Sequence, residues 1–348
     1  MTGKRFAKLS TALTLLLLMM VGALQVAIDP LFQYHQPWFG MEPVITDERY
    51  QNAGVAKTFD YDNVIIGNSL SENFIVSDVE KALGGKTVKL TASGSHTVDW
   101  RYSLDILKHK APNNILINLD PFVLNADPFE LKHELPGYLY DNNYLNDVNY
   151  LFNFSILNKY SYQAIKKNRA NKVPDYNKAF VWGDEKKTGK KEAIEHYRAR
   201  TEEAKVINNY HGLKETARAN MNNINEYYQE MPDTQFVFFC SPFSILSWYT
   251  AYQSNGLKAW RETYLTIIGD LVKNKNVSVY FWNDPETRDT ICNLDYYTDE
   301  AHYNVDVCKM ICDRISKKYG LLNKDNYQET INSFFDFLDS YDYDAIFA

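Results

Sequence analysis

A serine, an aspartate and a histidine stand where a nucleophile and its base would be expected. Ser69 lies in the segment IIGNSLSENF, directly after a short apolar run, and Asp299 and His302 are three residues apart in YYTDEAHYN. A serine hydroxyl is a poor nucleophile without a base, and a carboxylate one turn from a histidine can orient the imidazole and stabilise its protonated form. These residues predict a catalytic triad of Ser69, Asp299 and His302.

A glycine supports this hypothesis, and capping offers an alternative to it. Gly94, in TASGSHT, lets the backbone approach a substrate oxygen, so the N–H groups of Ser69 and Gly94 are expected to bind an oxyanion. His96 lies close enough to line the same cleft, although capping or packing explains it equally well. Ser69 and Glu72 also fit a capping box, and Asp299 alone fits a helix N-cap. The pairing of Asp299 with His302 favours catalysis.

The elements that must position these residues follow an alternating pattern. Strands are expected where short runs are rich in β-branched or aromatic residues, at 63–67, 86–92, 114–120, 235–241 and 277–283. Helices are expected between and after them, at 71–84, 97–110, 214–230, 256–274 and 304–319. This alternation predicts an α/β fold with a parallel five-stranded sheet and helices on both faces. Ligands of such sheets bind at the carboxyl ends of the strands, where all the candidate residues fall.

One gap interrupts the alternation. More than a hundred residues separate the third and fourth predicted strands, which is too long for a simple crossover. We expect a large insertion over about 121–212 within a catalytic domain at 61–322, although a second domain is an open alternative. A Pro- and aromatic-rich connector precedes this domain at 29–60, and an acidic aromatic tail follows it at 323–348.

The N-terminus predicts a membrane segment. A cytoplasmic stretch at 1–8 contains three basic residues, and a mostly apolar run at 9–28 is long enough to span a bilayer once. A cleaved signal peptide is the alternative, although its apolar region is normally shorter. Because flanking basic residues stay in the cytoplasm, an anchor at 9–28 would place the rest of the chain outside, as a single-pass protein of the cell membrane.

The charge balance and the cysteines set further bounds. The net charge of −7 offers no general basic surface for nucleic acid, so we expect no nucleic-acid partner. An external location would permit disulfides, and a bridge from Cys292 to Cys308 or Cys312 would staple the loop before His302 to the last predicted helix. Buried free thiols, including Cys240 in its strand, are the alternative.

The chain resembles the SGNH hydrolase superfamily. The resemblance rests on Ser69 in IIGNSLSE, on Gly94 in TASGSHT and on Asp299 to His302 as a closing DxxH before the last helix. It implies a flavodoxin-like three-layer sandwich and a serine mechanism with no metal or organic cofactor. The family takes an oxyanion-hole Asn from a GxND turn, whereas this chain has INLDPF, so Asn118 is a candidate donor out of its usual context. Asn68 and Asp120 are further candidates for the substrate cleft.

Within this superfamily, the anchor and the external domain resemble proteins that act beside membrane-bound O-acyltransferases. Examples are the D-alanyl transfer protein of teichoic acids and the alginate O-acetylation proteins. The resemblance implies a Ser69 acyl-enzyme that transfers acetyl or D-alanyl groups to a cell-surface polysaccharide or teichoic acid, or that hydrolyses such an ester. A non-catalytic scaffold of the same fold, which recruits an acyltransferase or a cell-wall polymer, is the alternative.

Overall fold

The structure is a computed structural model that describes residues 3–183, 186–203 and 210–347. These residues form two compact units, which we name the N-terminal unit (3–60 and 135–179) and the sheet unit (61–134 with the described residues from 180 onward). The middle of the expected insertion therefore belongs with the expected connector in the N-terminal unit, and the remainder of the insertion belongs to the sheet unit.

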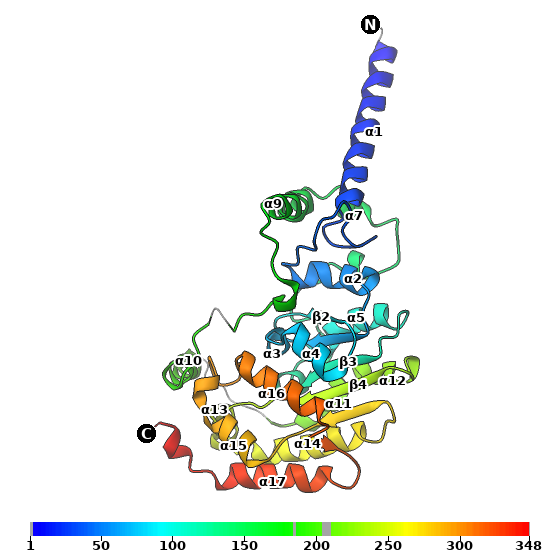
Figure 1. Ribbon diagram of the computed structural model, residues 1–348. Coiled ribbons are helices and arrows are strands. Elements are labelled where there is room, and N and C mark those ends of the chain that lie inside the picture. Colours follow the sequence, from blue (N-terminus) through cyan, green and yellow to red (C-terminus); the bar gives the residue numbers. More distant parts are fainter. Residues whose placement is uncertain (1–2, 184–185, 204–209, 348) are drawn as a thin grey trace. The chain divides into compact units, whose positions relative to one another are not determined.

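A six-stranded sheet forms the centre of the sheet unit (Figure 1). Its strand order is β2-β1-β3-β4-β5-β6, and β1 to β5 pair in parallel. Nearly every strand residue is buried, as expected of strands covered on both faces. The strands are β1 (Asn63–Gly67), β2 (Thr87–Thr91), β3 (Asn114–Leu119), β4 (Gln235–Cys240), β5 (Val277–Tyr280) and β6 (Leu321–Leu322).

The strand β6 makes the sheet mixed. It pairs with β5 in the antiparallel direction, through Leu321 opposite Tyr280 and Leu322 opposite Val279. A strand of two residues has no alternation that a sequence pattern can detect. The prediction of a purely parallel sheet of five strands was therefore wrong at this edge, whereas the α/β class is confirmed.

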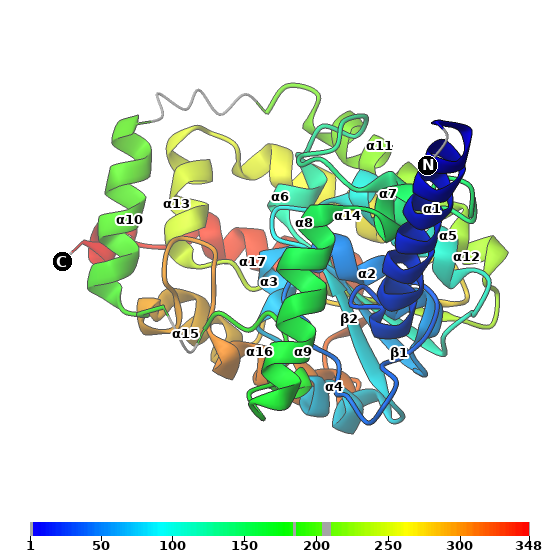
Figure 2. The same ribbon diagram turned by 90° about the horizontal axis from the view of Figure 1, so that it is seen from above.

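Helices cover the sheet in two groups. In one group α5 packs on α11, α11 on α14 and α14 on α17, while in the other α4 packs on α16. Figure 2 shows α4 and α16 on one side of the strands and α11 and α14 on the other. The helices of this unit are α3 (Ser69–Glu72), α4 (Val76–Leu83), α5 (Thr97–Leu107), α6 (Pro121–Leu124), α10 (Lys190–Glu203), α11 (Leu213–Asn225), α12 (Tyr227–Glu230), α13 (Ile245–Gln253), α14 (Leu257–Leu271), α15 (Pro285–Cys292), η4 (Leu294–Tyr296), α16 (Val305–Ser316), α17 (Tyr327–Ser340) and η5 (Tyr343–Ile346).

The N-terminal unit is helical and has its own small apolar core. Ile28, Val44 and Ala164 are buried together, with Ile165 and Val173 packed against them. The helices of this unit are α1 (Gly3–Ile28), α2 (Glu48–Thr58), η1 (Gly137–Leu139), α7 (Val148–Leu151), α8 (Phe154–Ile156), η2 (Leu157–Ser161), α9 (Tyr162–Arg169) and η3 (Tyr176–Lys178).

The helix α1 has the length and composition of a membrane-spanning segment. Most of its side chains from Phe6 to Leu24 are exposed, and they are predominantly apolar. A soluble protein rarely exposes such a continuous apolar surface. The helix is therefore suited to be a membrane anchor or a signal sequence.

The cysteines are free thiols. Cys240 in β4 and the pair Cys308 and Cys312 on α16 are buried, whereas Cys292 at the end of α15 is partly exposed. The structure has no bridge from Cys292 to α16, and the alternative of buried free thiols describes three of the four cysteines. Burial raises the pKa of the Cys240, Cys308 and Cys312 thiols, which keeps them protonated.

Candidate active site

The turn after β1 presents Ser69. Asn68 caps the helix α3, because its Oδ1 accepts a hydrogen bond from the backbone N–H of Leu70 at 3.0 Å. Ser69 is the first helical residue, so its own N–H has no partner within the helix. Gly67 allows this tight arrangement, since a Cβ there would overlap the side chains of Asn118 and Ser71. The capping-box interpretation of Ser69 was wrong, because Asn68 is the cap.

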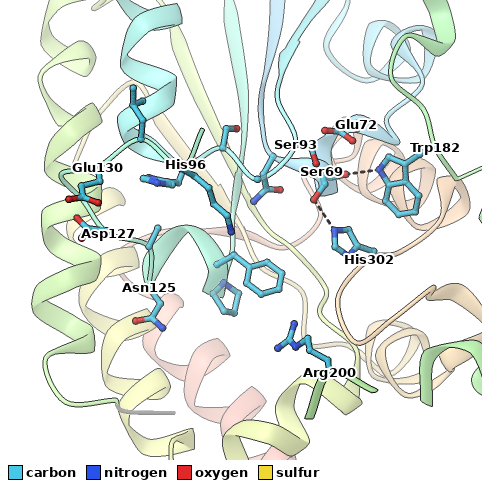
Figure 3. Close-up of a pocket in the computed structure, with 18 of the residues that line it drawn as sticks. Ser69, Glu72, Ser93, His96, Asn125, Asp127, Glu130, Trp182, Arg200 and His302 are labelled. Atoms are coloured by element: carbon cyan, nitrogen blue, oxygen red, sulfur yellow. Dashed lines mark hydrogen bonds between the residues drawn. The ribbon is translucent and has the colours of Figure 1, made fainter. Parts of the chain in front are cut away.

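The structure brings the three predicted triad residues together. Oγ of Ser69 lies 2.8 Å from Nε2 of His302, and Nδ1 of His302 lies 2.7 Å from Oδ2 of Asp299. Both are hydrogen-bond distances. Figure 3 shows the Ser69 and His302 side chains pointing toward each other at one end of a cleft. The arrangement is that of a nucleophile, a general base and a residue that orients the base.

A short closed loop holds Asp299 and His302 within one turn. Tyr297 and Tyr303 form an isolated antiparallel bridge across the loop, and the backbone N–H of Thr298 donates to the carbonyl of His302 at 2.9 Å. Directly after the loop, Asn304 caps α16 by accepting from Val307 at 3.3 Å. The DxxH spacing is thus fixed on both sides by backbone structure.

Hydrogen bonding keeps the Asp299 carboxylate ionised. Burial alone would raise the pKa of Asp299, but the hydrogen bond and charge of His302, together with two backbone amides, lower the pKa to about 2. These amides are those of Ala301 and His302, which both donate to Oδ1 at 2.8 Å. With Oδ1 satisfied by the backbone, Oδ2 remains for the imidazole.

Two residues that the sequence analysis missed support the triad. The ring of Trp182 packs edge-on against the His302 ring at 5.5 Å between centroids, and its Nε1 donates to the Ser69 carbonyl at 3.1 Å. Asn73, fully buried, accepts from the N–H groups of Trp182 and Gly183 at 3.1 and 2.8 Å and donates to the Tyr303 carbonyl at 2.9 Å. Asn73 therefore joins the end of α3, the Trp182 segment and the triad loop.

Gly94 lies on the wall of the same cleft as Ser69. Its φ of +70° is a conformation that favours glycine, and a Cβ there would lie 3.2 Å from Nε2 of His133. The neighbouring Ser95 hydroxyl donates to the Gly67 carbonyl at 3.0 Å, which ties this turn to the nucleophile turn. The two expected oxyanion donors, Ser69 and Gly94, therefore border one cleft.

Asn118 and Asp120 lie in a different environment. Both are fully buried and neither lines the cleft. The Asn118 amide donates to Asn68 Oδ1 at 3.2 Å and to Asp120, while its Oδ1 accepts from the Ser71 hydroxyl at 2.9 Å. Asn68 in turn donates to Asp120 Oδ2 at 3.1 Å. Burial raises the pKa of Asp120, which also caps α6 through Val123. We call Asn68, Ser71, Asn118 and Asp120 the buried amide cluster.

The cleft itself has a volume of about 1000 Å³, and both apolar and charged side chains line it. His96 borders it, at the start of α5, where its backbone N–H donates to Asp99 Oδ2 at 3.0 Å, and burial lowers the pKa of its imidazole. Arg200, on α10, borders it as well and pairs with the buried Glu300 of the triad loop. The other charged residues that line the cleft are Glu72, Asp127, Glu130, Lys132 and Lys186.

Neither a protein-family model nor a curated protein matches this chain.

Proposed function

We propose that this protein is a serine enzyme of acyl transfer. The observation that carries the proposal is the continuous hydrogen-bonded chain from Ser69 through His302 to Asp299, open to a cleft of about 1000 Å³ at the carboxyl ends of the strands. The depressed pKa of Asp299 fits the role of a carboxylate that orients an imidazole.

The geometry suggests the order of bond changes. His302 Nε2 takes the Ser69 proton as Oγ attacks the acyl carbonyl, and the tetrahedral oxyanion is bound by the N–H groups of Ser69 and Gly94. His302 then returns the proton to the departing oxygen, which leaves an ester on Ser69. A hydroxyl of an acceptor, or water, gives its proton to His302 and attacks the carbonyl of this ester. The bond between Oγ and the acyl group then breaks, and His302 returns the proton to Oγ, which restores the free serine.

Topology adds support for the SGNH superfamily. The order 2-1-3-4-5 of the five parallel strands is the order of flavodoxin-like folds. The proposed nucleophile follows the first strand, Gly94 follows the second, and the DxxH directly precedes α16, which α17 follows in the chain. The third strand still differs from the family pattern. Asn118 does not act as the family's oxyanion-hole Asn, because its donors are occupied within the buried amide cluster.

The particular function that we propose is acylation or deacylation of a cell-surface polymer. The apolar α1 suits an anchor that holds the enzyme at the outer face of the cell membrane. There, a membrane-bound O-acyltransferase would supply acetyl or D-alanyl groups, and a polysaccharide or teichoic acid would accept them. The charged side chains that line this open cleft, among them Lys132, Lys186 and Arg200, suit a hydrated polymer better than a lipid chain.

Labelling with a fluorophosphonate probe tests the catalytic part. The full-length protein in detergent should react at Ser69, as mapped by peptide mass spectrometry, and Ser69→Ala should abolish the labelling. Ser71→Ala is a matched control of the adjacent hydroxyl, which is buried and bonded to Asn118. Failure of the folded wild-type protein to react, with retained polymer acylation in Ser69→Ala cells, would favour the scaffold alternative.

A further inference from the structure

Exposed apolar side chains gather in the N-terminal unit. Outside α1, twelve large apolar or aromatic side chains are exposed among the described residues, and eight of these belong to the N-terminal unit, although the sheet unit is much the larger. We call the eight the apolar collar; they are Trp38, Phe39, Tyr144, Leu145, Val148, Phe152, Phe154 and Tyr162. Such a concentration on a small unit indicates an interaction surface.

Several contacts place parts of the collar beside the last turns of α1. Phe152 lies against Gly22, where an added Cβ would be 3.5 Å from its ring. Nε2 of His35 lies 2.7 Å from the carbonyl of Val26, and the His35 ring stacks on Trp38 with centroids 3.6 Å apart. The helix α7 packs on α1, and Figure 1 shows α7 and α9 beside the base of α1.

The exposed length of α1 matches the thickness of a bilayer. The stretch from Phe6 to Leu24 rises about 28 Å at about 1.5 Å per residue, close to the roughly 30 Å of a hydrocarbon core. Gln25 is the first fully buried side chain of the helix, and its Oε1 accepts from the Ser161 hydroxyl at 2.7 Å. The N-terminal unit therefore begins where the apolar span ends.

The buried carboxylate of Asp29 fixes the chain directly after α1. Asp29 accepts from the backbone N–H groups of Gln33, Tyr34 and His35 at 2.7 to 2.9 Å and from the Tyr150 hydroxyl at 2.6 Å. These bonds fix the chain after α1 to the segment that carries α7. The collar is thus attached to the helix at a defined height.

We infer that the apolar collar is a membrane-interface surface, whose aromatic rings enter the head-group region of the leaflet where α1 leaves the bilayer. Tyr and Trp favour this region because one part of the ring system is apolar and another is polar. The last turn of α9 supplies Lys166, Lys167 and Arg169, whose charges suit anionic lipid head groups. The inference rests on α1 as an anchor, which it shares with the proposed function, and does not depend on the Ser69 chemistry.

Quenching by brominated lipid tests the inference on the full-length chain. Trp38 is 48% exposed, and Trp100, Trp248, Trp260 and Trp282 are buried. In vesicles of phosphatidylcholine and phosphatidylglycerol brominated near the head-group end of the acyl chains, we expect strong quenching of the component of tryptophan emission contributed by Trp38. Trp38→Phe should remove that component, and Trp182→Phe, in the sheet unit, should leave it. Equal quenching of wild type and Trp38→Phe would overturn the inference.

A photoreactive residue identifies what covers the collar in cells. Placed at Phe154, it should form adducts with lipid in native membranes; placed at Phe129, which is slightly more exposed and lies in the sheet unit, it should not. Adducts of position 154 with protein alone would show that a partner occupies the collar and would overturn the inference. Fluorophosphonate labelling of the same variants tests the Ser69 chemistry separately, because the probe reacts only with the activated serine. A failure of the proposed membrane contact can therefore be told apart from a failure of the proposed enzyme function.

Discussion

Asn68 and Ser69 are neighbours in one turn, but their side chains enter two polar clusters with opposite properties. Asn68 joins the buried amide cluster, in which donors and acceptors bond one another and the other three members are fully buried. Ser69 joins the triad, where the side chains of His302 and Asp299 are 25% and 28% exposed. Both clusters lie at the same sheet edge, after β1 and β3 or in the loop before α16.

The buried amide cluster suits a role in stabilising the fold, whereas the triad suits a role in chemistry. A buried amide whose hydrogen bonds are all made holds the backbone in place, since leaving any partner unpaired costs free energy. The triad instead leaves one face of the hydroxyl and imidazole open to a substrate. Residue type and position at a strand end are therefore insufficient to assign a catalytic role; the remaining hydrogen-bonding capacity decides.

The largest expected effect is that of Asp299→Asn. An amide holds the imidazole in the wrong tautomer, so the kcat of the folded enzyme for hydrolysis of an aryl acetate should fall by about 10⁴-fold. Asp306→Asn, an exposed carboxylate on α16, is the control and should keep full activity. Retention of a tenth or more of the activity by Asp299→Asn would remove Asp299 from the triad.

Asn118→Ala tests the stabilising role of the buried amide cluster. It removes the hydrogen bonds that Asn118 makes with Asn68, Ser71 and Asp120 in a buried site, so the free energy of unfolding should fall by roughly 2–3 kcal/mol, measured by denaturant titration in detergent. The kcat of the folded fraction should fall by less than about tenfold. A drop of about 10² to 10³ would instead identify Asn118 as an oxyanion donor.

Acid should weaken the triad loop by a moderate amount. The pKa of Asp299 is about 2 in the folded protein against an ordinary value of 3.8, so its ionised form stabilises the fold by about 2 kcal/mol at neutral pH. Because the folded pKa is the lower one, this contribution is complete above the unfolded pKa and is lost as pH falls through about 2. The unfolding free energies of wild type and Asp299→Asn, compared along that range, should converge; a constant difference would contradict this assignment.

The smallest expected effect is that of Trp182→Phe. It removes the hydrogen bond to the Ser69 carbonyl but keeps a ring against His302, so we expect a loss of about 1 kcal/mol in stability and a few-fold decrease in kcat. Trp182→Leu, which also removes the ring, should decrease kcat further. Identical kinetics for both variants would show that the ring contact has no part in positioning His302.

The sequence predicted the parts of the site that depend on local patterns. Asp299 and His302 lie in one turn, and Ser69 follows an apolar strand, so spacing alone indicated them. Trp182 and Asn73 were missed because they meet across 109 residues, with no local pattern to connect them. Asn118 was assigned to the oxyanion hole by resemblance, and only its hydrogen bonds show where its donors point.

The fold was predictable to a similar extent. Five strands and most sheet helices follow from alternating apolar runs, with ends within a few residues of those expected. The grouping of residues 135–179 with residues 3–60 could not be predicted, since it depends on long-range pairs such as Asp29 with Tyr150 and Gln25 with Ser161. The strand β6 is too short for any pattern.

The buried thiols of Cys308 and Cys312 have a consequence for the biogenesis of the protein. Their burial on α16 and raised pKa leave almost no thiolate to attack an oxidant or a disulfide once the chain is folded. If the sheet unit is translocated across a membrane, as the proposed function requires, the same thiols are uncovered in transit, four residues apart on a chain that has not yet packed α16 against α4. In an oxidising compartment, α16 would then have to pack on the sheet unit before Cys308 and Cys312 are oxidised.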